Sequence, residues 1–174
     1  MNLINYIDYS VLEFIRANMR YDVLDKIMPI ITGLGDGGFI WIVIAIIFTV
    51  SKKYRTSGLL LFCSLLLCLI IGNITLKPFV ARLRPSDIYI NIPLLIPRPT
   101  DFSFPSGHTM TSFASAMIIF YTNKKMGIIA FLGAFIIAFS RLYLYVHYPS
   151  DIVAAIIIGT IISYFTLYIY NNKK

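Results

Sequence analysis

The chain has 174 residues, of which 58% are hydrophobic and 13% are charged. An ordinary soluble domain is about 45–50% apolar and about 25% charged, so this composition excludes a soluble globular protein. A net charge of +7 would favour nucleic-acid binding in a soluble chain, whereas in a membrane protein the positions of the Lys and Arg residues indicate which ends of the spans face the cytoplasm. Because one span needs ~20 apolar residues, we predict a single membrane domain over residues 1–174 and do not expect a nucleic-acid partner.

The first element is predicted to lie in the membrane interface rather than to cross the bilayer. Over residues 2–19, apolar positions that begin at Leu3 alternate at helical spacing with Asp8 and Glu13. This pattern is typical of an amphipathic interfacial helix. Residues 23–34 are predicted to continue it as a short, half-inserted helix.

Uncharged stretches that could cross a bilayer follow a glycine-rich turn at residues 33–38. They are residues 37–51, 56–76, 109–123, 126–140 and 152–172. We therefore predict an all-α fold, a multi-pass transmembrane helical bundle of about five spans, with six as the alternative count. Transporters place ionisable residues in the middle of their spans, and these stretches have none, so a pump or an ion-coupled carrier is not expected.

Basic residues alternate with the spans and predict their orientation. Three connections carry the pairs or clusters Lys52, Lys53 and Arg55; Lys124 and Lys125; and Lys173 and Lys174. By the positive-inside rule these ends are cytoplasmic. The loop of residues 77–107 and the segment 141–151 then lie together on the outer side, which is the periplasm or the cell exterior for a bacterial cytoplasmic (inner) membrane.

Three short patterns lie on that predicted outer side. They are Lys77 followed by Arg84 and Pro85; Pro105, Ser106, Gly107 and His108; and Ser140 and Arg141 followed by His147 and Asp151. Together they resemble the signature of the type 2 phosphatidic acid phosphatase family, K-x6-R-P, P-S-G-H and S-R-x5-H-x3-D. Every position is filled, and the resemblance covers residues 77–151.

The residue types in these patterns suit the binding of a phosphate group. A terminal phosphate carries about −1.5 to −2 charges and three acceptor oxygens at pH 7, so its site needs several cations or a metal ion. Lys77, Arg84 and Arg141 supply three cations, and arginine can contact two phosphate oxygens at once. Ser106 as N-cap and Gly107 are predicted to begin a helix whose free N–H groups also bind the anion.

The resemblance also implies a mechanism. It assigns His147 as the nucleophile that forms a phosphohistidine, Asp151 as the residue that orients its ring, and His108 as the general acid. No metal or other cofactor is implied, because the family is metal-independent. A zinc site of two histidines and Asp151 is the alternative, but three nearby cations would repel the ion.

The other charged residues of the outer side match no motif position. Arg82 and Arg98 are expected either to meet solvent or lipid head groups or to serve the site, and Asp101 is expected to be a loop residue. Small family members resemble bacterial lipid phosphatases, so the predicted partners are the bilayer and a lipid phosphate, with undecaprenyl pyrophosphate as the leading substrate. Lipid A 1-phosphate and phosphatidylglycerol phosphate are the alternatives, and a non-catalytic lipid-binding protein or a flippase is the alternative of another class.

Overall fold

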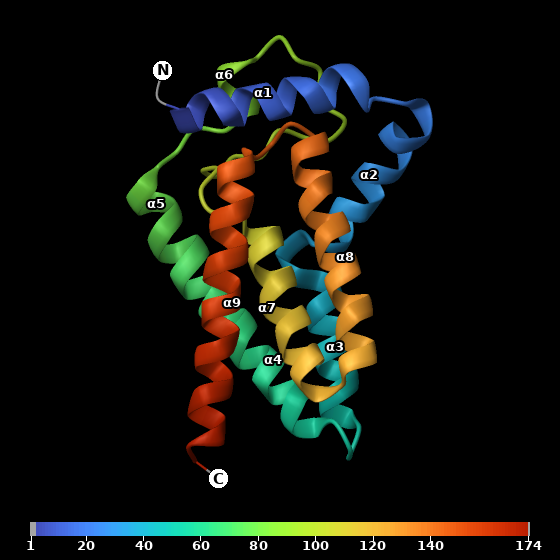
Figure 1. The fold of residues 1–174 in the computed structure, drawn as a ribbon, viewed down its shortest axis with the longest axis vertical. Coiled ribbons are helices and arrows are strands. Elements are labelled where there is room, and N and C mark those ends of the chain that lie inside the picture. Colours follow the sequence, from blue (N-terminus) through green and yellow to red (C-terminus); the bar gives the residue numbers. More distant parts are fainter. Residues whose placement is uncertain (1–2, 174) are drawn as a thin grey trace.

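The computed structural model describes residues 3–173 of the chain, and all secondary-structure elements in this range are helices (Figure 1). The helices α3 (Phe39–Val50), α4 (Arg55–Cys68), α7 (Gly107–Thr122), α8 (Lys124–Tyr143) and α9 (Pro149–Asn171) form an upright bundle. They coincide with the five apolar stretches in the sequence, which confirms the predicted all-α membrane bundle. The shorter elements η2 (Leu69–Leu76) and α5 (Lys77–Val80) extend α4 toward one end of the bundle, and α6 (Pro85–Ile88) follows after the non-helical residues 81–84.

Helix α7 is the centre of the bundle, because it packs against α8, α9 and α4. Close approach is possible where glycines replace larger residues. A Cβ atom at Gly159 would lie 2.5 Å from the carbonyl oxygen of Met110, and one at Gly127 would lie 2.2 Å from the Cα of Phe120. Small residues at helix crossings let backbones meet, which is a common packing device within membranes.

The number of membrane spans stays a prediction. Three described segments are long and apolar enough to cross a bilayer, namely residues 55–88, 124–143 and 149–171. The helices α2 (Asp22–Leu34) and α3 make a fourth when they are taken together as a pair bent by 46°. Helix α7 has 16 residues, which corresponds to a length of about 24 Å, and it lies inside the bundle.

Helix α1 (Leu3–Asn18) lies crosswise over one end of the bundle (Figure 1). Its Asp8, Leu12 and Ile15 are buried, whereas the apolar Leu3 and Phe14 are exposed. The predicted helix is therefore present. The sequence pattern placed Asp8 on the polar side of this helix, whereas the structure buries it on the side that faces the bundle. Helix α2 does not continue α1. It is a separate helix that leads into α3 through the 3-10 turn η1 (Asp36–Gly38).

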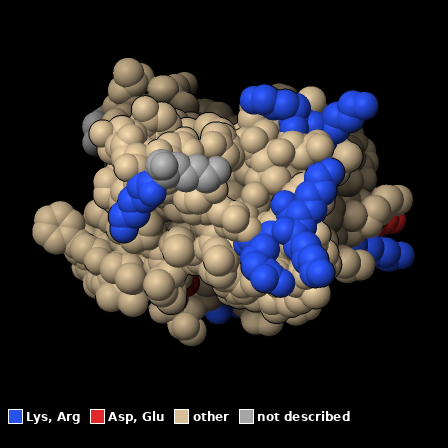
Figure 2. Space-filling view, turned by 90° about the horizontal axis from the view of Figure 1, so that it is seen from below, with Lys and Arg blue, Asp and Glu red and all other residues tan. Residues whose placement is uncertain are grey.

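The opposite end of the molecule is basic. Figure 2 views this end from below, and Lys and Arg side chains gather on it. The exposed basic residues of the three connections belong to this end: Lys52, Lys53, Arg55, Lys124, Lys125 and Lys173. The cavity described below lies near α1, at the other end of the bundle.

Candidate functional site

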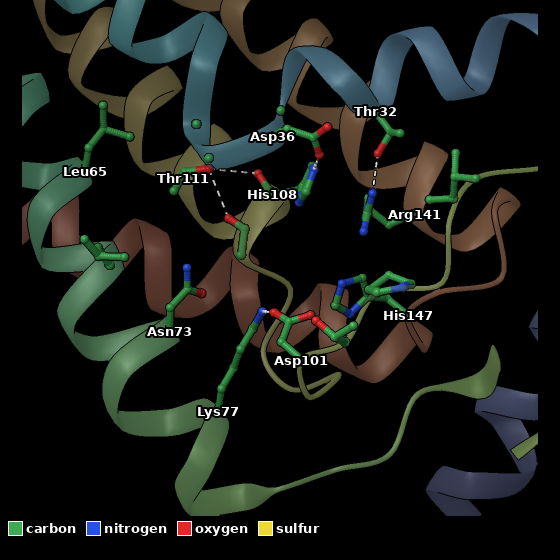
Figure 3. A pocket seen from close by; sticks show the side chains of 18 of the residues that line it. Thr32, Asp36, Leu65, Asn73, Lys77, Asp101, His108, Thr111, Arg141 and His147 are labelled. Carbon is green, nitrogen blue, oxygen red and sulfur yellow. Dashed lines mark hydrogen bonds and ion pairs between the residues drawn. The ribbon is translucent and has the colours of Figure 1, made fainter. Parts of the chain in front are cut away.

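A cavity of about 870 Å³ lies toward the α1 end of the bundle (Figure 3). Its walls come from α2, η1, α4, η2, the loop of residues 89–106, the start of α7, the end of α8 and the α8–α9 loop. Six residues of the three sequence patterns line it together: Lys77, Arg84, Gly107, His108, Arg141 and His147. Residues up to 70 positions apart in the chain therefore share one cavity, as the sequence predicted.

Local structure places each of the three cations. Lys77 begins α5 directly after the π-helical turn η2, and Arg84 precedes Pro85, which begins α6. Arg141 lies in the last turn of α8. All three side chains are buried, and Arg84 is only 2% exposed. Burying several like charges is costly unless anions compensate them, so this cluster indicates an anion-binding site.

Arg84 is held by several hydrogen bonds at once. Its Nε donates to the carbonyl oxygen of Asp101 at 2.8 Å, and its Nη1 donates to the carbonyl oxygen of Val146 at 2.7 Å. Its Nη2 donates to Oδ1 of Asp101 at 2.6 Å, and Lys77 donates to Oδ2 of the same carboxylate. Asp101 therefore bridges two cations of the cluster and is more than a loop residue.

The ionisation of Asp101 follows from these contacts. Partial burial would raise its pKa, but the hydrogen bonds and charges of Lys77 and Arg84 outweigh that effect and lower the pKa to about 2. The carboxylate is consequently ionised at neutral pH and contributes a fixed negative charge inside the cation cluster.

Arg141 completes the cluster from the opposite wall of the cavity (Figure 3). Its Nη1 donates to the hydroxyl of Thr32 from α2. Its Nε is buried and has no hydrogen-bond partner among residues 3–173. A buried guanidinium donor without a partner is costly, and an anion in the cavity is the kind of ligand that such a donor would bind.

His147 lies in the loop between α8 and α9 and is 1% exposed. Its Nε2 is 3.0 Å from Nη1 of Arg84. A guanidinium can only donate, so Nε2 must be the acceptor and the ring proton resides on Nδ1. Nδ1 lies 3.5 Å from Oδ2 of Asp151 and 3.5 Å from Oγ of Ser103. Asp151 thus favours the tautomer that leaves Nε2 unprotonated, as expected for a residue that orients the ring.

The pKa of His147 is low for a histidine. Burial lowers the pKa, the nearby Asp151 raises it, and the positive charges of Arg84 and Arg141 lower it again, so the net shift is downward. The imidazole is therefore neutral at physiological pH, which is the state that a nucleophile requires.

Asp151 accepts hydrogen bonds from three groups. Its Oδ2 accepts hydrogen bonds from the backbone N–H of Tyr148, at 2.9 Å, and from the hydroxyl of Ser103. Its Oδ1 accepts a hydrogen bond from Nη1 of Arg82 at 2.6 Å. Sequence reasoning had no signal for Ser103, because a lone serine in a loop fits many roles.

Arg82 connects the site to α1. Its Nη2 donates to Oδ2 of Asp8 at 2.7 Å, while its Nη1 donates to Asp151. Asp8 is 1% exposed and also accepts a hydrogen bond from the backbone N–H of Ser150 at 2.8 Å. Of the two roles expected for Arg82, the structure therefore shows internal pairing rather than contact with lipid head groups. Arg98 donates to the carbonyl oxygen of Ser86.

Ser106 of the P-S-G-H pattern differs in part from expectation, whereas Gly107 does not. Ser106 does occupy the N-cap position of α7, but its side chain makes no capping hydrogen bond. It is fully buried and accepts a hydrogen bond from the hydroxyl of Thr109 at 3.0 Å, and it does not line the cavity. Gly107 does line it, and a Cβ atom there would lie 3.0 Å from Oδ1 of Asn73.

His108 follows at the start of α7. Its Nε2 is 2.8 Å from Oδ1 of Asp36 in η1. The two histidines face the same cavity from different elements (Figure 3). Among the described residues, no three His, Cys, Asp or Glu side chains form a group that could hold a metal ion.

Fold and cavity together define an all-helical membrane protein with an anion site near one end of the bundle. The profile of the PAP2 superfamily matches residues 57–174. The chain belongs to the PAP2 superfamily, which confirms the resemblance that the three motifs indicated.

Several curated relatives are lipid phosphatases by name. An undecaprenyl-diphosphatase from Sulfolobus acidocaldarius is 32% identical over 132 residues, which cover 75% of this chain and 64% of the relative. A lipid A 4′-phosphatase from Bacteroides thetaiotaomicron is 40% identical over 94 residues, 50% of this chain and 42% of the relative. Phosphatidylglycerophosphatase B from Bacillus subtilis is 31% identical over 160 residues, 83% of this chain and 74% of the relative. The chain thus spans less than two thirds of the length of the first two relatives.

Two solved structures share the fold. A transmembrane PAP2-type phosphatidylglycerolphosphate phosphatase from Bacillus subtilis superimposes with a TM-score of 0.81 at 23% identity, covering 100% of this chain and 89% of that one. LpxE from Aquifex aeolicus gives a TM-score of 0.77 at 26% identity, covering 97% and 99%. Because the Bacillus subtilis structure is only 23% identical in sequence, its similarity supports the fold alone.

Proposed function

We propose that this protein is a membrane lipid phosphatase that removes the terminal phosphate of a lipid pyrophosphate through a phosphohistidine on His147. The observation that carries the proposal is the convergence of three buried cations and an unprotonated histidine nitrogen on one cavity. A phosphate bound by Lys77, Arg84 and Arg141 would lie beside Nε2 of His147. The lipid phosphatase names of several relatives support the same activity.

The proposed first step transfers the phosphoryl group to the enzyme. Nε2 of His147 attacks phosphorus, the bond from phosphorus to the bridging oxygen breaks, and that oxygen takes a proton from His108. In the second step water attacks the phosphohistidine, the P–N bond breaks, and His108 takes a proton from the water. Inorganic phosphate then leaves, and both histidines return to their initial states.

The three cations would stabilise the charge that spreads over the phosphoryl oxygens in each transition state. Asp151 would stabilise the positive charge that develops on His147 when Nε2 forms its bond to phosphorus. The residues proposed for phosphate binding are Lys77, Arg84, Gly107 and Arg141. Ser106 is proposed to act only through the backbone at the start of α7, since its side chain is buried and does not line the cavity.

A lipid substrate fits the shape and lining of the cavity. Beside the charged groups, its wall includes apolar side chains of α3, α4 and η2, namely Ile42, Phe62, Leu65, Leu66 and Leu69. An apolar wall that continues along the spans suits the tail of a lipid whose phosphate lies among the cations. A soluble phosphate ester has no apolar tail that would contact this wall.

The orientation of the protein supports an undecaprenyl pyrophosphate phosphatase in particular. The basic end in Figure 2 would be cytoplasmic by the positive-inside rule, so the cavity would open to the periplasm or cell exterior of a bacterial cytoplasmic membrane. Undecaprenyl pyrophosphate is our leading substrate because its recycling takes place on that outer face. Lipid A and phosphatidylglycerol phosphate are the competing substrates.

The test is phosphate release by the purified protein in detergent with a chelator present. Undecaprenyl pyrophosphate, lipid A, phosphatidylglycerol phosphate and phosphatidic acid would be compared, with His147→Ala as the matched variant. We expect release by the wild type alone and fastest from undecaprenyl pyrophosphate. Release by His147→Ala at the wild-type rate would refute the mechanism, and no release from any lipid would favour a lipid-binding protein or a flippase.

A further inference from the structure

The turn between α2 and α3 is built around His108. Gly37 and Gly38 have φ angles of 57° and 76°, a left-handed conformation that glycine adopts without strain. At Gly35, a Cβ atom would lie 2.6 Å from Cδ2 of His108. The glycines of this turn therefore let the chain pass tightly beside the imidazole, and they bring Asp36 next to it.

Among residues 3–173, His108 is the residue that forms a hydrogen bond with the side chain of Asp36. Nε2 of His108 donates to Oδ1 of Asp36 at 2.8 Å, and the Asp36 carboxylate is not used to cap η1 or α3. The Asp36 side chain is 71% exposed, so burial does not explain its position. Because this carboxylate caps neither helix, its contact with His108 is the interaction that accounts for its position.

The surroundings of His108 are otherwise positive. Burial and the positive charges of Arg141 from α8 and Lys77 from α5 lower the pKa of His108 to about 4, and Asp36 is the carboxylate that opposes this shift. Arg84, Asp101 and His147 line the same cavity. A histidine that must donate a proton beside two cations needs a nearby negative charge to hold that proton.

We propose that Asp36 is a positioning residue that orients His108 and stabilises its protonated form, so that Nδ1–H faces the leaving oxygen. This inference rests on the proposed function. The cavity would then contain two histidine–carboxylate pairs of opposite polarity. Asp151 lies beside Nδ1 of His147 and leaves Nε2 unprotonated for the attack, whereas Asp36 accepts a hydrogen bond from Nε2 of His108 and leaves Nδ1 to donate.

The experiment can avoid turnover altogether, because the chain contains only two histidines. The full-length protein, labelled with ¹³C and ¹⁵N histidine in detergent, would give two sets of ring resonances, and the set lost in His108→Asn identifies His108. In Asp36→Asn, which keeps the size of the side chain and removes the charge, the pH at which His108 titrates should fall by about one unit. The His147 resonances should not move.

Asp22→Asn is the matched control, because Asp22 is an exposed carboxylate of α2 outside the cavity. It should leave both histidines unchanged. If His108 titrates at the same pH in Asp36→Asn as in the wild type, the inference is wrong whether or not the protein hydrolyses lipids. A failure of the proposed function would instead appear as absence of phosphate release with the histidine titration intact.

Kinetics give a second readout. Loss of the carboxylate should slow hydrolysis of a lipid phosphate monoester, whose alkoxide leaving group needs a proton, by about tenfold at neutral pH. Hydrolysis of an aryl phosphate, whose leaving group needs none, should change much less. Equal slowing of both substrates would indicate a general loss of structure and would overturn the positioning role.

Discussion

Asp101 accepts a hydrogen bond from Nη2 of Arg84 at 2.6 Å, and its other carboxylate oxygen accepts one from Lys77. The two cations proposed to bind the phosphate of the substrate are thus bridged by an anion of the chain itself. Since the Asp101 side chain is half exposed and lies in the loop of residues 89–106, it can move without unfolding the bundle. An incoming phosphate must compete with it.

Replacing Asp101 by asparagine should therefore strengthen inhibition by inorganic phosphate or vanadate. Removing a competing charge raises the fraction of sites that are free to bind, and we expect the inhibition constant to fall by about tenfold. Asp22→Asn, which removes an exposed carboxylate of α2 outside the cavity, is the control. Weaker inhibition in Asp101→Asn would show instead that the carboxylate is needed to position the two cations.

Arg82 should support catalysis although it does not belong to the three motifs. Its guanidinium bridges Asp8 and Asp151, so Arg82→Gln should let Asp151 and the His147 ring shift. A misplacement of about 1 Å can cost roughly 10²-fold in rate, and the loss should fall on kcat with KM nearly unchanged. Arg16→Gln, which affects an exposed pair with Glu13 on α1, should have no effect. A wild-type kcat in Arg82→Gln would contradict the prediction.

His147 should remain neutral well into the acidic range. Burial is the main cause that lowers its pKa, the charges of Arg84 and Arg141 lower it further, and the opposing effect of Asp151 does not reverse the shift. An ordinary histidine becomes protonated as the pH falls through about 6.5. In the labelled protein, the His147 resonances should therefore show no titration between about pH 8 and pH 5. A midpoint near 6.5 would mean that the ring is more hydrated than its burial implies.

The same pKa shift has a consequence for stability. Below about pH 6.5 the unfolded chain binds a proton at His147 that the folded protein does not bind, so the folded state loses stability as the pH falls. His147→Asn removes this titrating group. The unfolding temperature in detergent should therefore drop less between pH 7 and pH 5 in the variant than in the wild type, and an identical drop would contradict the assignment.

Packing between α7 and α9 should depend on Gly159. A Cβ atom there would lie 2.5 Å from the carbonyl oxygen of Met110, so Gly159→Ala should force the helices apart and cost about 1–3 kcal/mol. Gly133→Ala in α8 is the control, because its Cβ would have no neighbour within 4 Å. Thermal unfolding in detergent should show a lower midpoint only for Gly159→Ala. Equal midpoints would show that the crossing can relax.

The membrane fold and the motif cavity could be predicted because both depend on local patterns. Apolar stretches of sufficient length must be helical in a bilayer, since backbone groups there can pair only within a helix or a closed barrel. The residues of the three motifs carry a recognisable chemistry at fixed spacing, and six of them line one cavity as predicted. The ranges of α3, α8 and α9 accordingly differ from expectation by only a few residues.

The sequence by itself determined the membrane class and the ranges of the long helices, and it predicted the phosphate chemistry of Lys77, Arg84 and His147. Only the tertiary structure decided the partners of the remaining charges: Asp101 with Arg84, Asp36 with His108, and Asp8 with Arg82. The side chains of the last two pairs come from elements more than 70 positions apart. Such pairs carry no local signature, because a buried charge selects whichever opposite charge the packing of distant helices brings within hydrogen-bond distance.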